Sequence, residues 1–199
     1  MAGFHVAAVP VGRLDVEEIE AALNRAAKVL HQPVELREAL PIPRGAEDVE
    51  RKQHRAGTLI KRLAVEVLKL KPGRLVGSGD AEAKAPYAPD GFVFITDVDL
   101  YTANTDGVHA ALLTAKGLSV VSIRRLREAF YRRKADLNKQ RTRLVKETTR
   151  MAARLRGVPE CRDPACVLAA SKMLADLDLK EERFCRACSQ RLFEGTMRI

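Results

Sequence analysis

The chain has 199 residues, of which 46% are hydrophobic, and a formal net charge of +9 at pH 7. This length suffices for one domain with a substantial core. No apolar run approaches the ~18–20 residues that cross a bilayer, which excludes a membrane-spanning protein and predicts no membrane partner. The N-terminal segment is too short and too uncharged for a secretory signal, so we expect a cytoplasmic protein. The sequence does not determine an oligomeric state, and a monomer is the simplest expectation.

Residues 124–156 carry the whole charge excess, with 13 Lys or Arg against 3 Asp or Glu. A charge run of this kind is usually the solvated face of an amphipathic helix. It could instead attract a polyanion such as nucleic acid. Only Phe130 and Tyr131 are available there to stack on bases, so a basic nucleic-acid-binding module is an alternative function rather than the favoured one.

The N-terminal half predicts strands alternating with helices. An apolar run from Phe4 ends at Pro10 and predicts a first strand. Residues 15–30 have apolar positions at helical spacing behind an Asp15 cap. Residues 34–40 alternate like a half-buried strand, and residues 49–70 predict a second amphipathic helix that ends before Pro72 and Gly73.

The C-terminal half continues the pattern. Residues 91–101 predict a buried strand, and residues 108–123 a hairpin that turns at Lys116 and Gly117. A basic helix is expected over residues 136–156, with Gly157 in its C′ position. Asp178 followed by Glu181 is typical of a capping box, and predicts a final helix that Gly195 ends. The predicted inner face of the basic helix comprises Leu137, Leu144, Val145, Thr148, Met151, Ala152 and Leu155. The fold class is therefore α/β (α+β), a sandwich of one sheet packed on helices.

Four cysteines lie close together near the C-terminus, with the spacing C-x4-C-x18-C-x2-C: Cys161, Cys166, Cys185 and Cys188. In a cytosolic protein, thiols at short spacing hold metal more often than they form disulfides. Four thiolates complete a tetrahedral Zn²⁺ site and leave no open position, so the predicted zinc is structural. Two disulfides, or unpaired structural thiols, are the alternatives. A zinc here would join a C-terminal subdomain, residues 158–199, to an N-terminal subdomain, residues 1–157.

These cysteines, together with Gly157, resemble a pattern of the archaemetzincins, the zinc metalloproteases of peptidase family M54 in the metzincin clan. That family carries His-Glu-x-x-His-x-x-Gly-x-x-His-Cys, a second Cys after four residues, then x-Met, and later Phe-Cys-x-x-Cys. Gly157, Cys161, Cys166 and the Phe184-Cys185-x-x-Cys188 run stand at matching spacing. Further similar blocks are TDVDLY (96–101), SVVSIRRLR (119–127) and RLVKE (143–147). The resemblance covers nearly all of 1–199 as one domain, and it implies a metzincin-like sandwich with a mixed, mostly parallel sheet.

The sequence departs from the family where the catalytic zinc would bind. The first and second histidine positions are Arg150 and Arg154, the general-base position is Met151, and the third ligand position is Glu160. A guanidinium stays protonated and offers no lone pair, and a thioether cannot take a proton from water. We therefore predict no catalytic zinc and one structural zinc. A guanidinium–carboxylate pair with Glu160 is expected at the former metal position.

Three further expectations concern the family resemblance and its consequences for function. Leu168 stands where the family has its methionine. The four histidines of the chain, His5, His31, His54 and His109, precede the basic helix and are taken as unrelated to a catalytic site. The favoured function is a proteolytically inactive archaemetzincin-like protein with a peptide-binding role along an edge strand at residues 108–114. An active zinc-dependent metallopeptidase or aminopeptidase with a non-standard site is the alternative, so enzymatic activity is left open.

Overall fold

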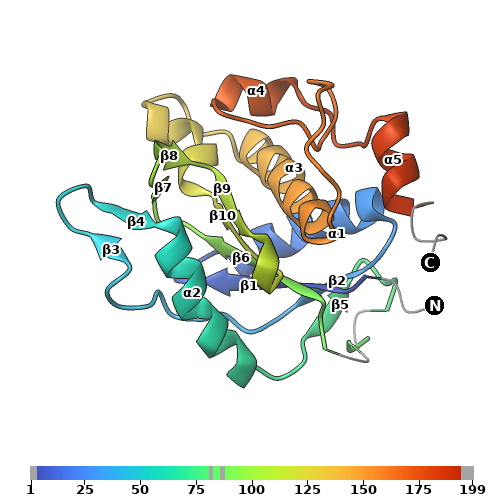
Figure 1. The fold of residues 1–199 in the computed structure, drawn as a ribbon, viewed down its shortest axis with the longest axis horizontal. Coiled ribbons are helices and arrows are strands. Elements are labelled where there is room, and N and C mark those ends of the chain that lie inside the picture. Colours follow the sequence, from blue (N-terminus) through green and yellow to red (C-terminus); the bar gives the residue numbers. More distant parts are fainter. Residues whose placement is uncertain (1–3, 81–82, 86–87, 194–199) are drawn as a thin grey trace.

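The structure is a computed structural model that describes residues 4–80, 83–85 and 88–193. Its centre is a six-stranded sheet in the order β5-β2-β1-β6-β10-β9 (Figure 1). Strands β2, β1, β6 and β10 are parallel, and the two outer strands β5 and β9 run antiparallel to their neighbours. The predicted mixed, mostly parallel sheet is confirmed. The strand bounds are β1 (Val6–Val11), β2 (Val34–Leu36), β5 (Arg74–Val76), β6 (Gly91–Thr96), β9 (Ala110–Leu113) and β10 (Leu118–Ser122).

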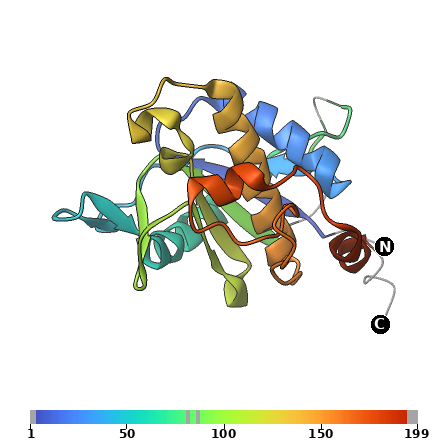
Figure 2. The same ribbon diagram turned by 90° about the horizontal axis from the view of Figure 1, so that it is seen from above.

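Helices cover both faces of this sheet, and each face has its own hydrophobic core. Helices α1 (Val16–Leu30) and α3 (Leu137–Leu155) lie side by side on one face, where Leu23 and Val145 are buried. Helix α2 (Ala56–Glu66) packs on the opposite face with Leu59 against the strands. Figures 1 and 2 show these layers from two directions. The sheet is thus buried on both sides, as expected for mostly parallel strands.

Local signals place the ends of α1 and α3. The Asp15 carboxylate accepts hydrogen bonds from the amides of Glu17 and Glu18. Asp136 caps α3 in the same way, at 2.9 Å from the amide of Lys139. Gly157 follows α3 with a φ of +89°, a conformation that glycine adopts without steric cost. The predicted bounds of the basic helix are confirmed to within one residue at each end.

The predicted helix over residues 49–70 is only partly correct. Residues 47–55 instead supply two strands of a second, four-stranded sheet, and α2 begins at Ala56 before ending in a 3-10 turn, η1 (Val67–Lys69). Long-range pairing explains the difference, because the amide of His54 donates to the Asp99 carbonyl at 2.7 Å. The second sheet comprises β3 (Glu47–Asp48), β4 (Gln53–Arg55), β7 (Leu100–Thr102) and β8 (Thr105–Val108).

Strand β1 continues through Pro10, where the sequence predicted its end. Pro10 pairs with Ile95 in the register of β1 and β6. Its carbonyl accepts from the amide of Leu40 at 2.9 Å, on the side where β2 has already ended at Leu36. In a strand, the nitrogen and carbonyl of one residue point to the same side. The absent N–H of Pro10 therefore removes no bond to β6.

The hairpin of β9 and β10 is confirmed, with a 3-10 turn, η2 (Thr114–Lys116), between its strands. Gly117 ends this turn at a φ of +63°, and a Cβ there would meet the Asp90 carbonyl oxygen at 2.8 Å. Two further 3-10 turns, η3 (Arg124–Leu126) and η4 (Glu128–Tyr131), lead from β10 into α3.

The C-terminal segment, residues 158–193, packs against α3 through a small core that includes Ala153, Val158, Leu168 and Leu192. Its helices are α4 (Leu174–Leu179) and α5 (Arg186–Phe193). The predicted capping box is wrong, because Asp178 lies inside α4 and its carboxylate pairs with Arg143. Gly195 lies outside the described residues. Among the helices that the structure describes, none has the length and apolar character needed to cross a membrane.

Candidate metal centre and the buried ion cluster

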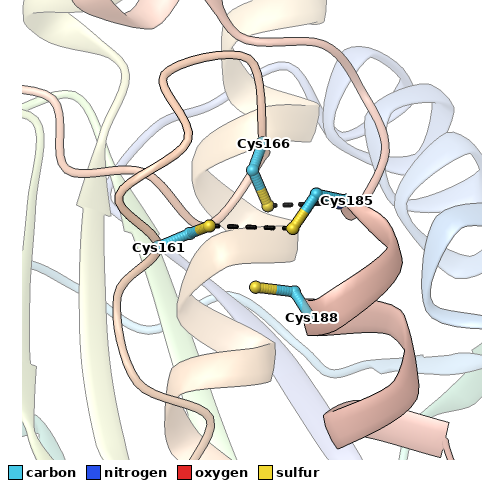
Figure 3. A group of neighbouring side chains, drawn as sticks. All are labelled: Cys161, Cys166, Cys185 and Cys188. Carbon is cyan, nitrogen blue, oxygen red and sulfur yellow. Dashed lines mark hydrogen bonds between the residues drawn. The ribbon is translucent and has the colours of Figure 1, made fainter.

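The four cysteines converge on one point, as Figure 3 shows. Their Sγ atoms all lie within 4.8 Å of one another, and no cysteine is in a disulfide. Cys161 and Cys185 bring their sulfurs to 3.7 Å. Thiolates about 2.3 Å from a tetrahedral Zn²⁺ would be about 3.8 Å apart, whereas a disulfide bond is about 2.05 Å long. The donor set and its spacing therefore fit a closed zinc site. In the described part of the chain no other cluster of potential metal ligands is present.

Two separate segments position these thiols. Cys161 and Cys166 lie on the loop after α3, where the Cys161 amide donates to the Leu168 carbonyl at 3.1 Å. Cys185 directly precedes α5, and Cys188 lies in its first turn. A metal bound by all four residues would join the loop to α5 and hold both against α3. Because all four positions are protein ligands, the chemistry it would supply is structural.

Backbone amides approach two of the four sulfurs, and hydrogen bonds of this outer kind orient metal ligands. The amide of Asp163 lies 3.4 Å from Cys161 Sγ, and that of Cys185 lies 3.3 Å from Cys166 Sγ. The backbone amide of Cys188 lowers the pKa of the Cys185 thiol. Burial raises the pKa of Cys166 and of Cys188 in the protein without metal. The cysteines predicted to bind zinc are thus brought together as one candidate site.

A second cluster, of charged side chains, lies around Arg150 on α3, the residue that the resemblance aligned with the first histidine of the archaemetzincin motif. Arg150 is buried, and its Nη2 donates to Glu147 Oε2 at 2.6 Å. Its Nη1 donates to Glu160 Oε1 at 3.1 Å. The expected pair between Arg150 and Glu160 is therefore present. The shortest hydrogen bond of Arg150, however, is to Glu147, a carboxylate that the sequence analysis did not single out.

Glu147 is fully buried and has further partners from the C-terminal segment. Lys180 Nζ and Ser171 Oγ each lie 3.4 Å from Glu147 Oε1. Although burial alone would raise the pKa of Glu147, the charges of Arg150 and Lys180 lower it to about 2. Burial lowers the pKa of Lys180. Two carboxylates, Glu147 and Glu160, thus balance two cations, Arg150 and Lys180.

His109 lies beside this cluster, contrary to the expectation that the histidines are unrelated to the site. It is buried, its Nδ1 has no hydrogen-bond partner among the described residues, and burial lowers its pKa. The charges of Glu147, Arg150 and Lys180 all act on it. Of the cluster residues that the sequence analysis missed, only Glu147 carried a signal in the sequence, since it stands one helical turn before Arg150. Nothing local indicated His109 or Lys180.

The remaining positions that the sequence analysis named are the other aligned motif positions and the inner face of α3. Some are buried in the core and others are exposed. Met151 is 2% exposed and belongs to the core between α3 and the sheet. Arg154 does not join Glu160, since its Nη1 donates to the Val158 carbonyl at 3.1 Å. Leu168 is buried next to Cys166 and Cys188. Most of the predicted inner face of α3 is buried, but Leu137 is 60% exposed and lies outside it.

The interpretation of residues 124–156 as a solvated charged face is wrong for the second half of α3, because every residue from 143 to 153 is buried. Arg143 donates to Glu128 and to Asp178, at 2.6 Å each. Lys146 Nζ donates to the Leu177 carbonyl at 3.1 Å, near the C-terminal end of α4. These cations join α3 to the C-terminal segment and leave less charge for a polyanion.

Comparison with known proteins agrees with this fold and site. The sequence profile of peptidase family M54 matches residues 88–194. An archaemetzincin of Saccharolobus islandicus is 35% identical over 107 residues, which cover 54% of this chain and 57% of the relative. The chain thus spans about half the length of that relative. An archaemetzincin of Natronomonas pharaonis is 29% identical over 194 residues, 94% of this chain and 99% of the relative.

Solved structures show the same fold. A crystal structure of a zinc-dependent peptidase from Methanocorpusculum labreanum superimposes with a TM-score of 0.80 at 23% identity, over 94% of this chain and 99% of that one. An archaemetzincin from Methanopyrus kandleri gives a TM-score of 0.73 at 23% identity, over 98% of both chains. Since the family profile covers more than half of the sequence, the chain belongs to peptidase family M54, the archaemetzincin family of zinc metallopeptidases.

Proposed function

We propose that this chain is an archaemetzincin-family protein without peptidase activity, which keeps one structural zinc and binds extended peptides along the free edge of β9. The single observation that carries the loss of catalysis is the pairing of Arg150 with both Glu147 and Glu160. A catalytic zinc needs about three protein ligands with free lone pairs and one open position. Here a permanently protonated guanidinium occupies the first ligand position, and both nearby carboxylates already neutralise cations.

The position of the general base supports the same proposal. Met151 stands there, and its side chain is buried in the hydrophobic core rather than turned toward Glu160. A thioether has no proton affinity in the working pH range and cannot activate water. His109 interacts electrostatically with this cluster and is a candidate substitute ligand, but one neutral imidazole beside two cations would not hold Zn²⁺ against their repulsion.

The peptide-binding role rests on β9, which is the last strand of the large sheet. The amide of Ser122 donates to the carbonyl of His109 at 2.8 Å, so these opposite residues form a hydrogen-bonded pair. Along an antiparallel ladder, hydrogen-bonded pairs alternate with pairs that are not hydrogen-bonded. The amide of Ala111 therefore points toward β10, and the amide of Ala110 points toward the free edge of the sheet. An extended peptide could add there as a further strand.

The test combines activity with metal content. Purified protein is incubated with casein and with quenched fluorescent peptides, with and without a chelator, and zinc is measured by elemental analysis. We expect no turnover above the chelated sample and one zinc per chain. Turnover that chelation abolishes and added zinc restores, together with two zinc ions per chain, would refute the proposal in favour of an active metallopeptidase.

A further inference from the structure

A cavity of about 680 Å³ opens where β1 and β2 end, and none of its lining residues belongs to the cysteine site or to the Glu147 cluster. Its size is within the ~300–1,000 Å³ typical of small-molecule sites. In α/β proteins, ligands bind preferentially beyond the carboxyl ends of parallel strands, and this cavity lies at such ends. Its charged lining consists of four cations and one acid: Arg37, Lys71, Arg74, Lys84 and Glu38.

The walls of the cavity are held in place by a carboxylate beneath it. Glu35 is fully buried, and its Oε1 accepts from Arg37 Nε at 2.8 Å and from the Gly73 amide at 2.6 Å. Both donors are lining residues. Gly73 has no room for a side chain, because a Cβ would lie 2.1 Å from the Leu36 carbonyl oxygen. This contact brings residues 71–74 directly against the end of β2.

Arg37 lines the cavity, and its guanidinium has one nitrogen that Glu35 does not use. The residue is 9% exposed, and its ring-stacking partner is Phe92, 5.2 Å from the guanidinium carbon. Its hydrogen bonds to Glu35 use Nε and Nη2, and Nη1 has no hydrogen bond with a described residue. A guanidinium that is already oriented loses little entropy when an anion binds to it.

The remaining cations differ in how far they are already neutralised. Arg74 pairs with Glu20. Lys71 and Lys84 form no ion pair with any residue that the structure describes, and both are exposed at the rim. Beside these charges, Pro10, Leu36 and Pro72 supply an apolar wall. The lining therefore suits an anionic head group attached to a less polar body.

We propose that this cavity binds a small organic anion, whose phosphate or carboxylate group contacts Arg37, Lys71 and Lys84 while its apolar part rests on Pro10, Leu36 and Pro72. This site goes beyond the proposed function and does not depend on it. Arg37, held in place by Glu35, is the preorganised part of the lining, and the two exposed lysines set the charge at the entrance.

Isothermal titration calorimetry of the zinc-loaded full chain tests the proposal. The probes are inorganic phosphate, AMP and succinate, with uncharged adenosine to separate stacking from charge recognition. We expect saturable binding of at least one anion, at one site per chain, and an affinity that falls as salt rises. Preference for AMP over succinate would assign a phosphate ligand, and the reverse preference a carboxylate ligand.

Matched variants locate the site. Lys71→Gln combined with Lys84→Gln should weaken anion binding about tenfold or more, since both changes are exposed and remove only charge. Lys69→Gln is the control, because Lys69 pairs with Glu66 and does not line the cavity. Thermal unfolding checks that all variants fold. The proposal is overturned if no anion binds saturably up to roughly 10 mM, or if the double variant binds as tightly as the unmodified chain.

Discussion

Arg150 and Glu147 lie one helical turn apart on α3 and form a buried ion pair, with Nη2 and Oε2 separated by 2.6 Å. The Glu147 side chain has no exposed surface, and Arg150 also reaches Glu160. This relationship joins the two parts of the molecule, because Lys180 of the C-terminal segment neutralises the same carboxylate. Glu147, Arg150, Glu160 and Lys180 therefore form one ion network that joins α3 to the C-terminal segment.

Removing the charge of Glu147 should destabilise the protein strongly. In Glu147→Gln the buried cations Arg150 and Lys180 lose their shared partner, and an uncompensated buried charge costs about 3–5 kcal/mol. Urea unfolding followed by circular dichroism measures the change in the free energy of unfolding. The control is Glu66→Gln, which removes an exposed pair with Lys69 and should cost no more than about 1 kcal/mol. Equal costs for both variants would contradict a central role for Glu147.

The same carboxylate should make the free energy of unfolding fall as the pH is lowered below 4.5. The pKa of Glu147 is about 2 in the folded protein, against 4.5 ordinarily, so the unfolded chain takes up this proton first. Its contribution is complete above pH 4.5 and is lost as the pH falls toward 2. Glu147→Gln lacks this titration, so the stability difference between the two proteins should shrink over that range. Because both proteins share the cysteines, proton uptake by the thiols cancels in the difference. If the difference in stability between the two proteins stays constant with pH, Glu147 does not have a lowered pKa in the folded protein.

Loss of zinc should loosen only part of the C-terminal segment. Cys188→Ser removes one ligand, and we expect its zinc content to fall from one per chain to near zero. Amide hydrogen exchange should then accelerate in residues 158–170 and in α5. It should stay slow in α4, because Lys146 still donates to Leu177 and Arg143 still binds Asp178.

The neighbouring change Ser189→Ala, on the same helix, provides a control that keeps all four thiols. It should retain zinc and protection throughout. Equal loss of protection in α4 and α5 on zinc removal would show instead that the metal holds the whole segment.

Peptide binding at β9 can be tested with two prolines at adjacent positions. Ala110→Pro removes an amide that points to the free edge, so it should keep the fold and abolish binding of labelled casein peptides in fluorescence anisotropy. Ala111→Pro removes an amide that belongs to the ladder with β10, and should lower the midpoint of thermal unfolding. Unchanged peptide binding by Ala110→Pro would rule out strand addition at this edge.

Much of the fold could be predicted because its signals are local. Asp136 and Gly157 bound α3 through groups within one turn of themselves, and Gly117 marks the hairpin in the same way. The cysteine cluster was also predictable, since four thiols at short spacing leave few chemical alternatives. Residues 49–55 were misassigned because their helical periodicity is outweighed by backbone pairing with a segment more than 40 residues away.

The sequence by itself thus determined that Arg150 and Arg154 offer no lone pair to a metal and that four cysteines could hold a structural zinc, because those properties belong to the side chains. Only the tertiary structure decided what the basic residues of α3 do. Lys180 pairs with Glu147, which is 33 residues away in the sequence, and Arg143 pairs with Asp178, which is 35 residues away. A charge run is solvated or buried according to which distant carboxylates pack against it, and that packing depends on the whole fold.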